Sequence, residues 1–304
     1  MSLETDAVID RRRLTRRLGL WRTIAILTLL AAAIVALGRT AGTPWEKPHV
    51  ARLAVTGLIS EDRERDQTLD RLARDANVRA LIVYINSPGG TIVGGETLFR
   101  ELRQIAETKP VVAVMGTLAT SGGYMAAIGA DYIFAGNGSI TGSIGVILQA
   151  ADVTGLLEKL GVSMEAIKSG PLKAVPSPFE PLTDEGREAT RAVVMDMYDL
   201  FVDMVTERRQ LPREAVVKLA DGRVYTGRQA VENRLIDAVG GEEEARDWLA
   251  QQHEIPRAIP VREVKIERPT RGMLGWAQQL AGKALFSERL TLDGLVSLWH
   301  PDLR

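Results

Sequence analysis

Two short, almost continuously apolar segments constrain the fold most strongly. Residues 78–85 (Val-Arg-Ala-Leu-Ile-Val-Tyr-Ile) and residues 110–115 (Pro-Val-Val-Ala-Val-Met) have the length and the β-branched content of strands. Apolar runs without polar alternation are typical of parallel strands that are buried on both faces. Segments with helical spacing, residues 69–75 and 94–108, lie around them. The alternation predicts an α/β domain with a largely parallel sheet.

The rest of the chain extends this pattern as far as residue 255. We expect further strands at residues 49–57, 139–147 and 163–168, and further helices at residues 183–209, 214–219, 227–233 and 242–251. Thr183 is suited to cap the longest of these helices. Beyond residue 255 prolines break the chain, and residues 273–299 are apolar and amphipathic. We therefore predict a domain at 49–255 and an amphipathic C-terminal extension at 256–304.

The N-terminus predicts a membrane anchor. A basic segment, residues 1–22, precedes an uncharged and strongly apolar stretch at residues 23–38, and residues 39–48 read as a proline-containing linker. Extended backwards, the stretch approaches the ~20 residues that a bilayer requires. Arginines stay cytoplasmic, so we expect a single-pass helix in the inner membrane and a domain on the periplasmic side. A cleaved signal peptide and a buried core helix are the alternatives.

Composition excludes several classes of function. The net charge of -1 offers no basic field for nucleic acid. The chain has no cysteine, which excludes disulfides, thiolate metal sites and cysteine nucleophiles. None of the three histidines lies near a glycine-rich turn, so a hydrolase of this sequence would need a base other than histidine. We expect neither a metal nor a cofactor.

Two glycine-rich turns follow the predicted buried strands. The first, Ser87-Pro-Gly-Gly90, exposes backbone amides that could stabilise an oxyanion, although it could also be a simple tight turn. The second, Thr120-Ser-Gly-Gly-Tyr124, places Ser121 where a helix begins. Ser121 is there either a nucleophile or an ordinary helix cap, and the sequence leaves both readings open.

A third segment, residues 168–179, contains two lysines in a loop shaped by one glycine and three prolines. A lysine acts as a general base only when burial or a neighbouring cation favours its neutral form. Most loop lysines are solvated surface residues instead.

Together these segments resemble signal peptide peptidase A, the serine-lysine peptidases of family S49. The resemblance covers about residues 50–250 in matching order and rests on these motifs: Asn86-Ser-Pro-Gly-Gly, Thr120-Ser-Gly-Gly-Tyr, Ser139-Ile-Thr-Gly-Ser-Ile-Gly-Val, Ser169-Gly-Pro-Leu-Lys, Asp221-Gly-Arg-Val-Tyr-Thr-Gly-Arg-Gln-Ala and Leu235-Ile-Asp-Ala-Val-Gly-Gly. The length resembles the half-size bacterial form with one catalytic module.

The resemblance implies a mechanism and an assembly. Ser121 matches the nucleophile, Lys173 the general base and Ser143 the serine that orients the lysine, while the amides of Gly90 and Gly122 match the oxyanion hole. The implied fold is crotonase-like, as in the caseinolytic protease. The implied substrates are remnant signal peptides or similar apolar peptides. The implied working unit is a homo-oligomeric ring, an octamer, whose active sites combine Ser121 of one subunit with Lys173 of its neighbour.

Two other functions suit the same fold class. An acyl-CoA hydratase or isomerase would also hold an oxyanion with glycine amides, but an exported domain would be separated from cytosolic CoA. A membrane scaffold built on an inactive peptidase would not need Ser121, Lys173 and Ser143 together. A third possibility is a membrane peptidase of the same family, which would catalyse the same reaction and differ only in its native substrate.

Overall fold

The computed structural model describes residues 21–30, 47–266 and 295–298, and the chain forms two units, Met1–Lys47 and Pro48–Arg304. In the first unit residues 21–30 are helical, and the side chains of Trp21, Leu27 and Leu29 are exposed. Thr28 Oγ1 donates a hydrogen bond to the carbonyl of Ile24 at 2.8 Å. No helix within the described residues is long and apolar enough to cross a bilayer, and residues 31–38 of the predicted anchor lie outside that part of the chain.

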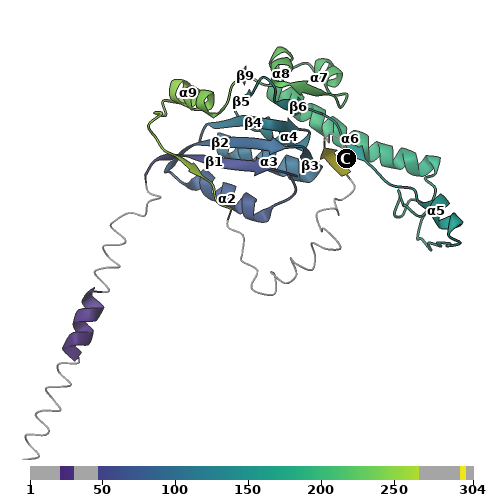
Figure 1. Cartoon of the computed structure of the whole chain (residues 1–304), viewed down its shortest axis with the longest axis horizontal. Coiled ribbons are helices and arrows are strands. Elements are labelled where there is room, and N and C mark those ends of the chain that lie inside the picture. Colours follow the sequence, from purple (N-terminus) through teal and green to yellow (C-terminus); the bar gives the residue numbers. More distant parts are fainter. Residues whose placement is uncertain (1–20, 31–46, 267–294, 299–304) are drawn as a thin grey trace, which may run out of the picture. The chain divides into compact units, whose positions relative to one another are not determined.

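The second unit is built on an eight-stranded sheet (Figure 1). Six strands lie side by side in the order β10-β1-β2-β4-β5-β9, and every neighbouring pair among them is parallel. Their bounds are β1 His49–Thr56, β2 Val78–Ser87, β4 Val111–Thr120, β5 Tyr132–Ala135, β9 Ala238–Val239 and β10 Val261–Glu263. The predicted α/β domain with a largely parallel sheet is confirmed.

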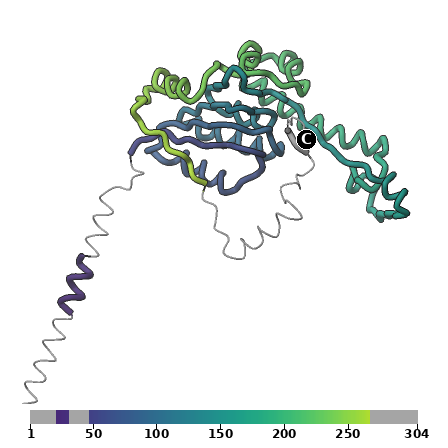
Figure 2. Tube along the Cα trace, in the orientation of Figure 1, coloured from purple at the N-terminus to yellow at the C-terminus, as the bar shows by residue number. Residues whose placement is uncertain are grey.

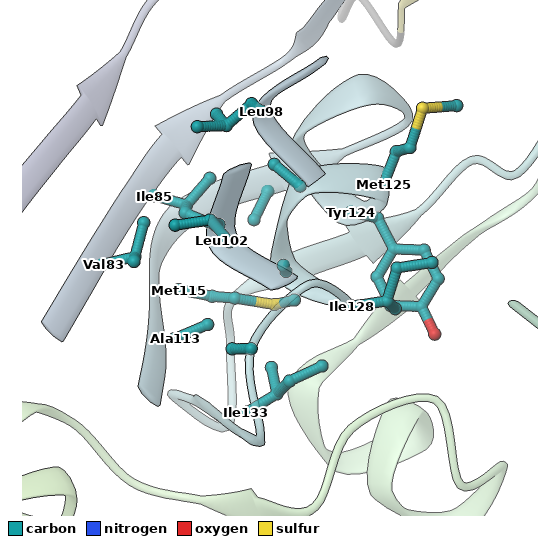
Figure 3. Packing of buried hydrophobic residues seen from close by; sticks show 14 of the residues in the cluster. Val83, Ile85, Leu98, Leu102, Ala113, Met115, Tyr124, Met125, Ile128 and Ile133 are labelled. Atoms are coloured by element: carbon teal, nitrogen blue, oxygen red, sulfur yellow. The ribbon is translucent and has the colours of Figure 1, made fainter. Parts of the chain in front are cut away.

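Helices cover both faces of this sheet, which explains the continuous apolar runs. On one face of the sheet lie α3 (Ile92–Ala106) and α4 (Gly122–Ala127). Val83 and Ile85 of β2 point to this face and belong to the same buried cluster as Leu98 and Leu102 of α3 (Figure 3). Ala80 and Ile82, which point the other way, pack with Leu249 of α9 (Glu242–His253). The helix α2 (Arg63–Arg74) lies against α3. Because side chains alternate across a strand, both sets of β2 residues become buried.

A short branch of the sheet extends beyond the end of β4. The last residues of β4 pair in parallel with β6 (Ile140–Gly142), and β6 pairs antiparallel with β8 (Val224–Thr226). The small helices α7 (Arg213–Leu219) and α8 (Gly227–Glu232) lie on either side of β8 in the sequence. This branch matters for the site because β4 and β6 both end next to Ser121.

Residues 149–200, which we call the arm, are barely buried. They comprise α5 (Thr154–Lys159), a loop and the first part of α6 (Asp184–Arg209), and Gly186 is the one buried residue among them. Figures 1 and 2 show α5 and the start of α6 extending away from the sheet. The end of α6 is anchored instead, because Phe201 and Val205 are buried and Arg209 pairs with Asp237 at 2.8 Å.

Several predicted boundaries differ from the structure. Residues 163–168 form no strand, because the arm places no partner strand beside them. The expected strand 139–147 is divided into β6 and the separate β7 (Ile147–Leu148). β10 is an edge strand of the main sheet, so the sheet continues beyond the predicted domain end at residue 255. Thr183 does cap α6, since its side chain accepts a hydrogen bond from the amide of Gly186.

The contact between α2 and α3 predicts a pH-dependent stability. Burial, followed by the nearby Asp66, raises the pKa of Glu101 to about 7, and its Oε2 is buried without a hydrogen-bond partner. The folded chain then binds more protons than the unfolded chain between about pH 4.5 and pH 7, so the free energy of unfolding should fall as pH rises through this window. Glu101→Gln should flatten this dependence in denaturant unfolding measured from pH 4.5 to 8.

Glu107→Gln, at an exposed position at the end of the same helix, is the matched control. An unchanged pH dependence in Glu101→Gln would show that Glu101 is not the titrating group.

Candidate active site

Ser121 and Ser143 lie side by side at the ends of two paired strands. Ser121 follows β4 and Ser143 follows β6, and the preceding residues, Thr120 and Gly142, are partners in the parallel ladder. The amide of Ser121 donates a hydrogen bond to the carbonyl of Gly142 at 2.8 Å. Two serines that are distant in the sequence are therefore held next to each other by backbone pairing.

The backbone of Ser121 is in an unusual conformation, with φ 57° and ψ −119°. A positive φ is disfavoured for a residue with a β-carbon and costs about 1–3 kcal/mol, which the surrounding structure must supply. Ser121 precedes α4, yet its side chain makes no capping hydrogen bond to that helix. The residue as a whole is only 1% exposed. The helix-cap reading, left open by the sequence, therefore does not account for this serine.

Ser143 is also held with a positive φ, of 49°, and is buried. Its amide donates a hydrogen bond to the carbonyl of Arg223 at 2.8 Å, just before β8. Gly142 has φ +82°, and a β-carbon there would lie 2.6 Å from Cδ2 of Tyr225. The Gly142-Ser143 turn is thus fixed against the β8 segment.

Gly90 and Gly122 come together beside Ser121. A β-carbon on Gly122 would lie 3.1 Å from the amide nitrogen of Gly90, so the two backbones are in direct contact. Gly122 is the first residue of α4, where an amide has no carbonyl partner within its own helix. In β3 (Gly89–Thr91), the bridge to Ile59 uses the amide of Thr91 and the carbonyl of Gly89, so the amide of Gly90 points to the opposite side.

The side chains of Ser87 and Thr120, whose role was not predicted from the sequence, fix the turn at residues 87–90. Ser87 Oγ donates to the carbonyl of Gly57 at 2.6 Å and accepts from the amide of Gly89 at 3.1 Å. Thr120 Oγ1 donates to the carbonyl of Pro88 at 3.1 Å, which ties the turn to the residue before Ser121. Both residues stand inside recognisable motifs, but the sequence gives no sign that these two motifs contact each other.

Lys173 is placed differently from the other predicted site residues. It lies in the arm and is exposed, with its amide bonded to the carbonyl of Gly170 at 3.1 Å. Within the described part of the chain its ammonium has no hydrogen-bond or ion-pair partner. The neighbouring Lys168 forms an ion pair with Glu180. One chain thus brings Ser121, Ser143, Gly90 and Gly122 together and displays Lys173 on the arm.

Comparison with models of protein families identifies the family of this chain. The model of "Peptidase family S49" matches residues 103–256, which is half of the chain and includes Ser121, Ser143 and Lys173. The chain belongs to peptidase family S49. It is therefore a serine peptidase, a hydrolase of peptide bonds. This family membership argues against the acyl-CoA hydratase or isomerase considered from the sequence.

Three relatives of this S49 peptidase come from three different organisms. A putative protease of Synechocystis sp. is 43% identical over 205 residues, which is 67% of this chain and 74% of that protein. A putative protease of Methanocaldococcus jannaschii is 40% identical, over 60% of this chain and 59% of that protein. A putative signal peptide peptidase SppA of Enterococcus faecium is 37% identical, over 70% of this chain and 66% of that protein.

Among solved structures, this S49 peptidase is similar to a ClpP1 mutant from Listeria monocytogenes. The likeness has a TM-score of 0.43 and 16% sequence identity, and covers 64% of this chain and 92% of that chain. A likeness this distant leaves the crotonase-like fold a prediction.

The close approach of Gly90 to Ile59 predicts that a single methyl group added at Gly90 strongly lowers activity. A β-carbon at Gly90 would lie 1.7 Å from the carbonyl oxygen of Ile59, a backbone atom that cannot move aside alone. Gly90→Ala should displace the amide that lies beside Gly122 and lower kcat for peptide hydrolysis by about 100-fold or more.

The matched control is Gly138→Ala, where a β-carbon would meet nothing within 4 Å. Steady-state kinetics of both variants measure kcat for peptide hydrolysis, which should fall in Gly90→Ala and stay at the wild-type value in Gly138→Ala. Wild-type kcat in a folded Gly90→Ala variant would contradict a role for this amide.

Proposed function

We propose that this chain is a membrane-anchored serine endopeptidase that uses a Ser121–Lys173 dyad. The observation that carries the proposal is the hydrogen bond from the amide of Ser121 to the carbonyl of Gly142. It holds a strained serine beside Ser143 and beside the amides of Gly90 and Gly122. A nucleophile next to paired backbone donors is the arrangement that acyl transfer requires.

The chemistry follows from these groups. Lys173 Nζ, in its neutral form, takes the proton of Ser121 Oγ as the oxygen bonds to the scissile carbonyl carbon. The carbonyl oxygen becomes negatively charged and accepts hydrogen bonds from the amides of Gly90 and Gly122. The carbon–nitrogen bond then breaks, and the proton passes from the lysine to the leaving amine. Water, deprotonated by the same lysine, finally hydrolyses the acyl-enzyme, while Ser143 orients the lysine.

We propose that the lysine reaches Ser121 from a neighbouring copy in a ring, an octamer. The arm exposes a series of large apolar side chains: Leu156, Leu160, Val162, Met164, Ile167, Leu172, Phe179, Val193, Met195 and Leu200. Ile167 is 98% exposed. An apolar surface of this kind is typical of a protein interface. Burial of Lys173 in that interface would favour the neutral form that a base requires.

The proposed substrates are remnant signal peptides or similar apolar peptides near the membrane. The similarity to a protein named a putative signal peptide peptidase supports this class. The apolar residues 23–38, preceded by arginines, would anchor the chain in the inner membrane with its catalytic domain on the periplasmic side. We further propose the half-size form of the family, with a crotonase-like fold.

Loss of either dyad residue should abolish hydrolysis. In the full chain in detergent, Ser121→Ala and Lys173→Ala should each lower kcat for an apolar fluorogenic peptide by at least about 1,000-fold, because the nucleophile and its base act as a unit. Lys159→Ala is the control for Lys173, since Lys159 is another exposed lysine of the arm. More than a tenth of wild-type activity in either dyad variant would refute the dyad.

A shared site should recover activity when the two inactive variants assemble together. A subunit with Ser121→Ala still supplies Lys173, and a subunit with Lys173→Ala still supplies Ser121. Random assembly of equal amounts leaves about a quarter of the sites intact, so about a quarter of wild-type activity should return. Coexpression followed by purification and assay measures this recovery. Complete inactivity of verified mixed oligomers would place both dyad residues in one subunit.

A further inference from the structure

A loop that follows β1 supports the turn that contains Gly90. Residues 57–60, which we call the backing loop, run along β3 and form a parallel bridge with it. The amide of Ile59 donates a hydrogen bond to the carbonyl of Gly89 at 2.8 Å, and the carbonyl of Ile59 accepts one from the amide of Thr91 at 2.9 Å. Gly90 is thus held between two hydrogen bonds to one residue of the backing loop.

The contact between the backing loop and this turn leaves no free space. A β-carbon on Gly90 would lie 1.7 Å from the carbonyl oxygen of Ile59. A β-carbon on Gly94, in the first turn of α3, would lie 2.8 Å from Cα of Ser60. Closely packed backbone transmits a displacement instead of absorbing it. A movement of Ile59 or Ser60 would therefore move the amide of Gly90.

The side chain of Arg65 holds the end of the backing loop. Arg65 lies in the first turn of α2, where its amide donates a hydrogen bond to Oδ1 of the N-cap residue Asp62 at 3.0 Å. Its Nη1 donates to the carbonyl of Ser60 at 3.3 Å, and its Nη2 donates to Oδ1 of Asp66 at 3.2 Å. The residue is 6% exposed. A buried, positively charged donor therefore connects α2 to the backing loop.

Stability does not explain why an arginine is buried here. Within the described part of the chain, Nε of Arg65 and Oε2 of Glu101 are both buried without a hydrogen-bond partner. Burial and the charge of Asp66 raise the pKa of Glu101 to about 7, and the charge of Arg65 opposes this rise across the contact between α2 and α3. A buried ionic group with incomplete partners is often less stable than a well-packed apolar residue of similar size. The charge is better explained by the group that it holds, the carbonyl of Ser60.

We propose that Arg65 is a positioning residue for the oxyanion hole, acting through Ser60 and Ile59 on the amide of Gly90. The proposal rests on the peptidase function proposed above and adds one residue to it. An oxyanion donor acts on charge that develops only in the transition state, so it contributes to kcat and little to substrate binding. A small displacement of such a donor lowers the rate steeply.

The test replaces Arg65 by Met in the full chain in detergent. Met has a similar length and favours a helix, so α2 keeps its packing while the donor to Ser60 is lost. Arg65→Met should lower kcat for an apolar fluorogenic peptide by about 10-fold or more and leave KM within about two-fold of the wild-type value. Arg74→Met, at an exposed position at the end of the same helix, is the matched control and should change neither constant.

A peptide aldehyde with the sequence of the substrate tests whether the loss lies at the oxyanion. The aldehyde carbon bonds to Ser121 Oγ, the serine proton passes to Lys173, and the aldehyde oxygen becomes the oxyanion. Its Ki should rise in Arg65→Met by the same factor by which kcat/KM falls, because both constants report the binding of one oxyanion. A general loosening of the fold would not give this proportion.

Two further variants test the same link. Arg65→Lys retains a cationic donor, which the nearby carboxyl groups of Asp66 and Glu101 keep charged, and it should restore kcat and the aldehyde Ki together toward their wild-type values. Gly94→Ala displaces Ser60 from the α3 side and should lower kcat at constant KM. Circular dichroism verifies folding, and Gly94→Ala and Arg65→Lys decide the question if Arg65→Met fails to fold.

The outcomes separate this proposal from the proposed function. Wild-type kcat and aldehyde Ki in folded Arg65→Met or Gly94→Ala, with hydrolysis that still depends on Ser121, would overturn the role of the backing loop and leave the peptidase intact. A rise in KM at constant kcat would also overturn it and would assign the backing loop to substrate binding. A wild-type chain that hydrolyses no peptide would overturn the proposed function and the role of Arg65 with it.

Discussion

The site depends on one backbone hydrogen bond, from the amide of Ser121 to the carbonyl of Gly142. It continues the β4–β6 ladder by one step, into two residues that both have positive φ. Strained backbone persists only where neighbours determine it. Here Thr120 is tied to Pro88 on one side, and Ser143 is tied to Arg223 on the other. The candidate nucleophile is therefore positioned by three segments of the chain rather than by its own turn.

Features set by local sequence were predictable. The continuous apolar runs indicated buried parallel strands because Ile82 and Val83 face opposite covered sides of one sheet. Thr183 caps α6 because a capping side chain needs only the next turn of the same helix. The residues predicted to form the oxyanion hole and to orient the base also lie together beside Ser121, since Gly122 begins α4, Ser143 follows β6 and Gly90 is in contact with Gly122. Their catalytic roles stay predictions.

Features set by distant partners were not predictable from the residues. Residues 163–168 have strand-like composition but no neighbouring strand, and composition alone cannot show that. The role of Ser87 depends on the carbonyl of Gly57, and the conformation of Ser143 depends on residue 223. The pairing of Leu295–Leu298 with β3 joins segments about as far apart as the domain allows. The sequence also could not decide whether Ser121 is a helix cap or a nucleophile, because a serine in either role stands just before a helix.

The link between Ser143 and Arg223 has a consequence for biosynthesis. A chain emerges from the ribosome from its N-terminus, and its early segments fold first. β4 and β6 can pair once residue 142 is available, but β8, which fixes the following turn, ends at Thr226. The strained backbone at Ser121 and Ser143 therefore lacks its last support until most of the domain has been made. A nascent chain would therefore contain Ser121 long before the backbone around this serine had its final support.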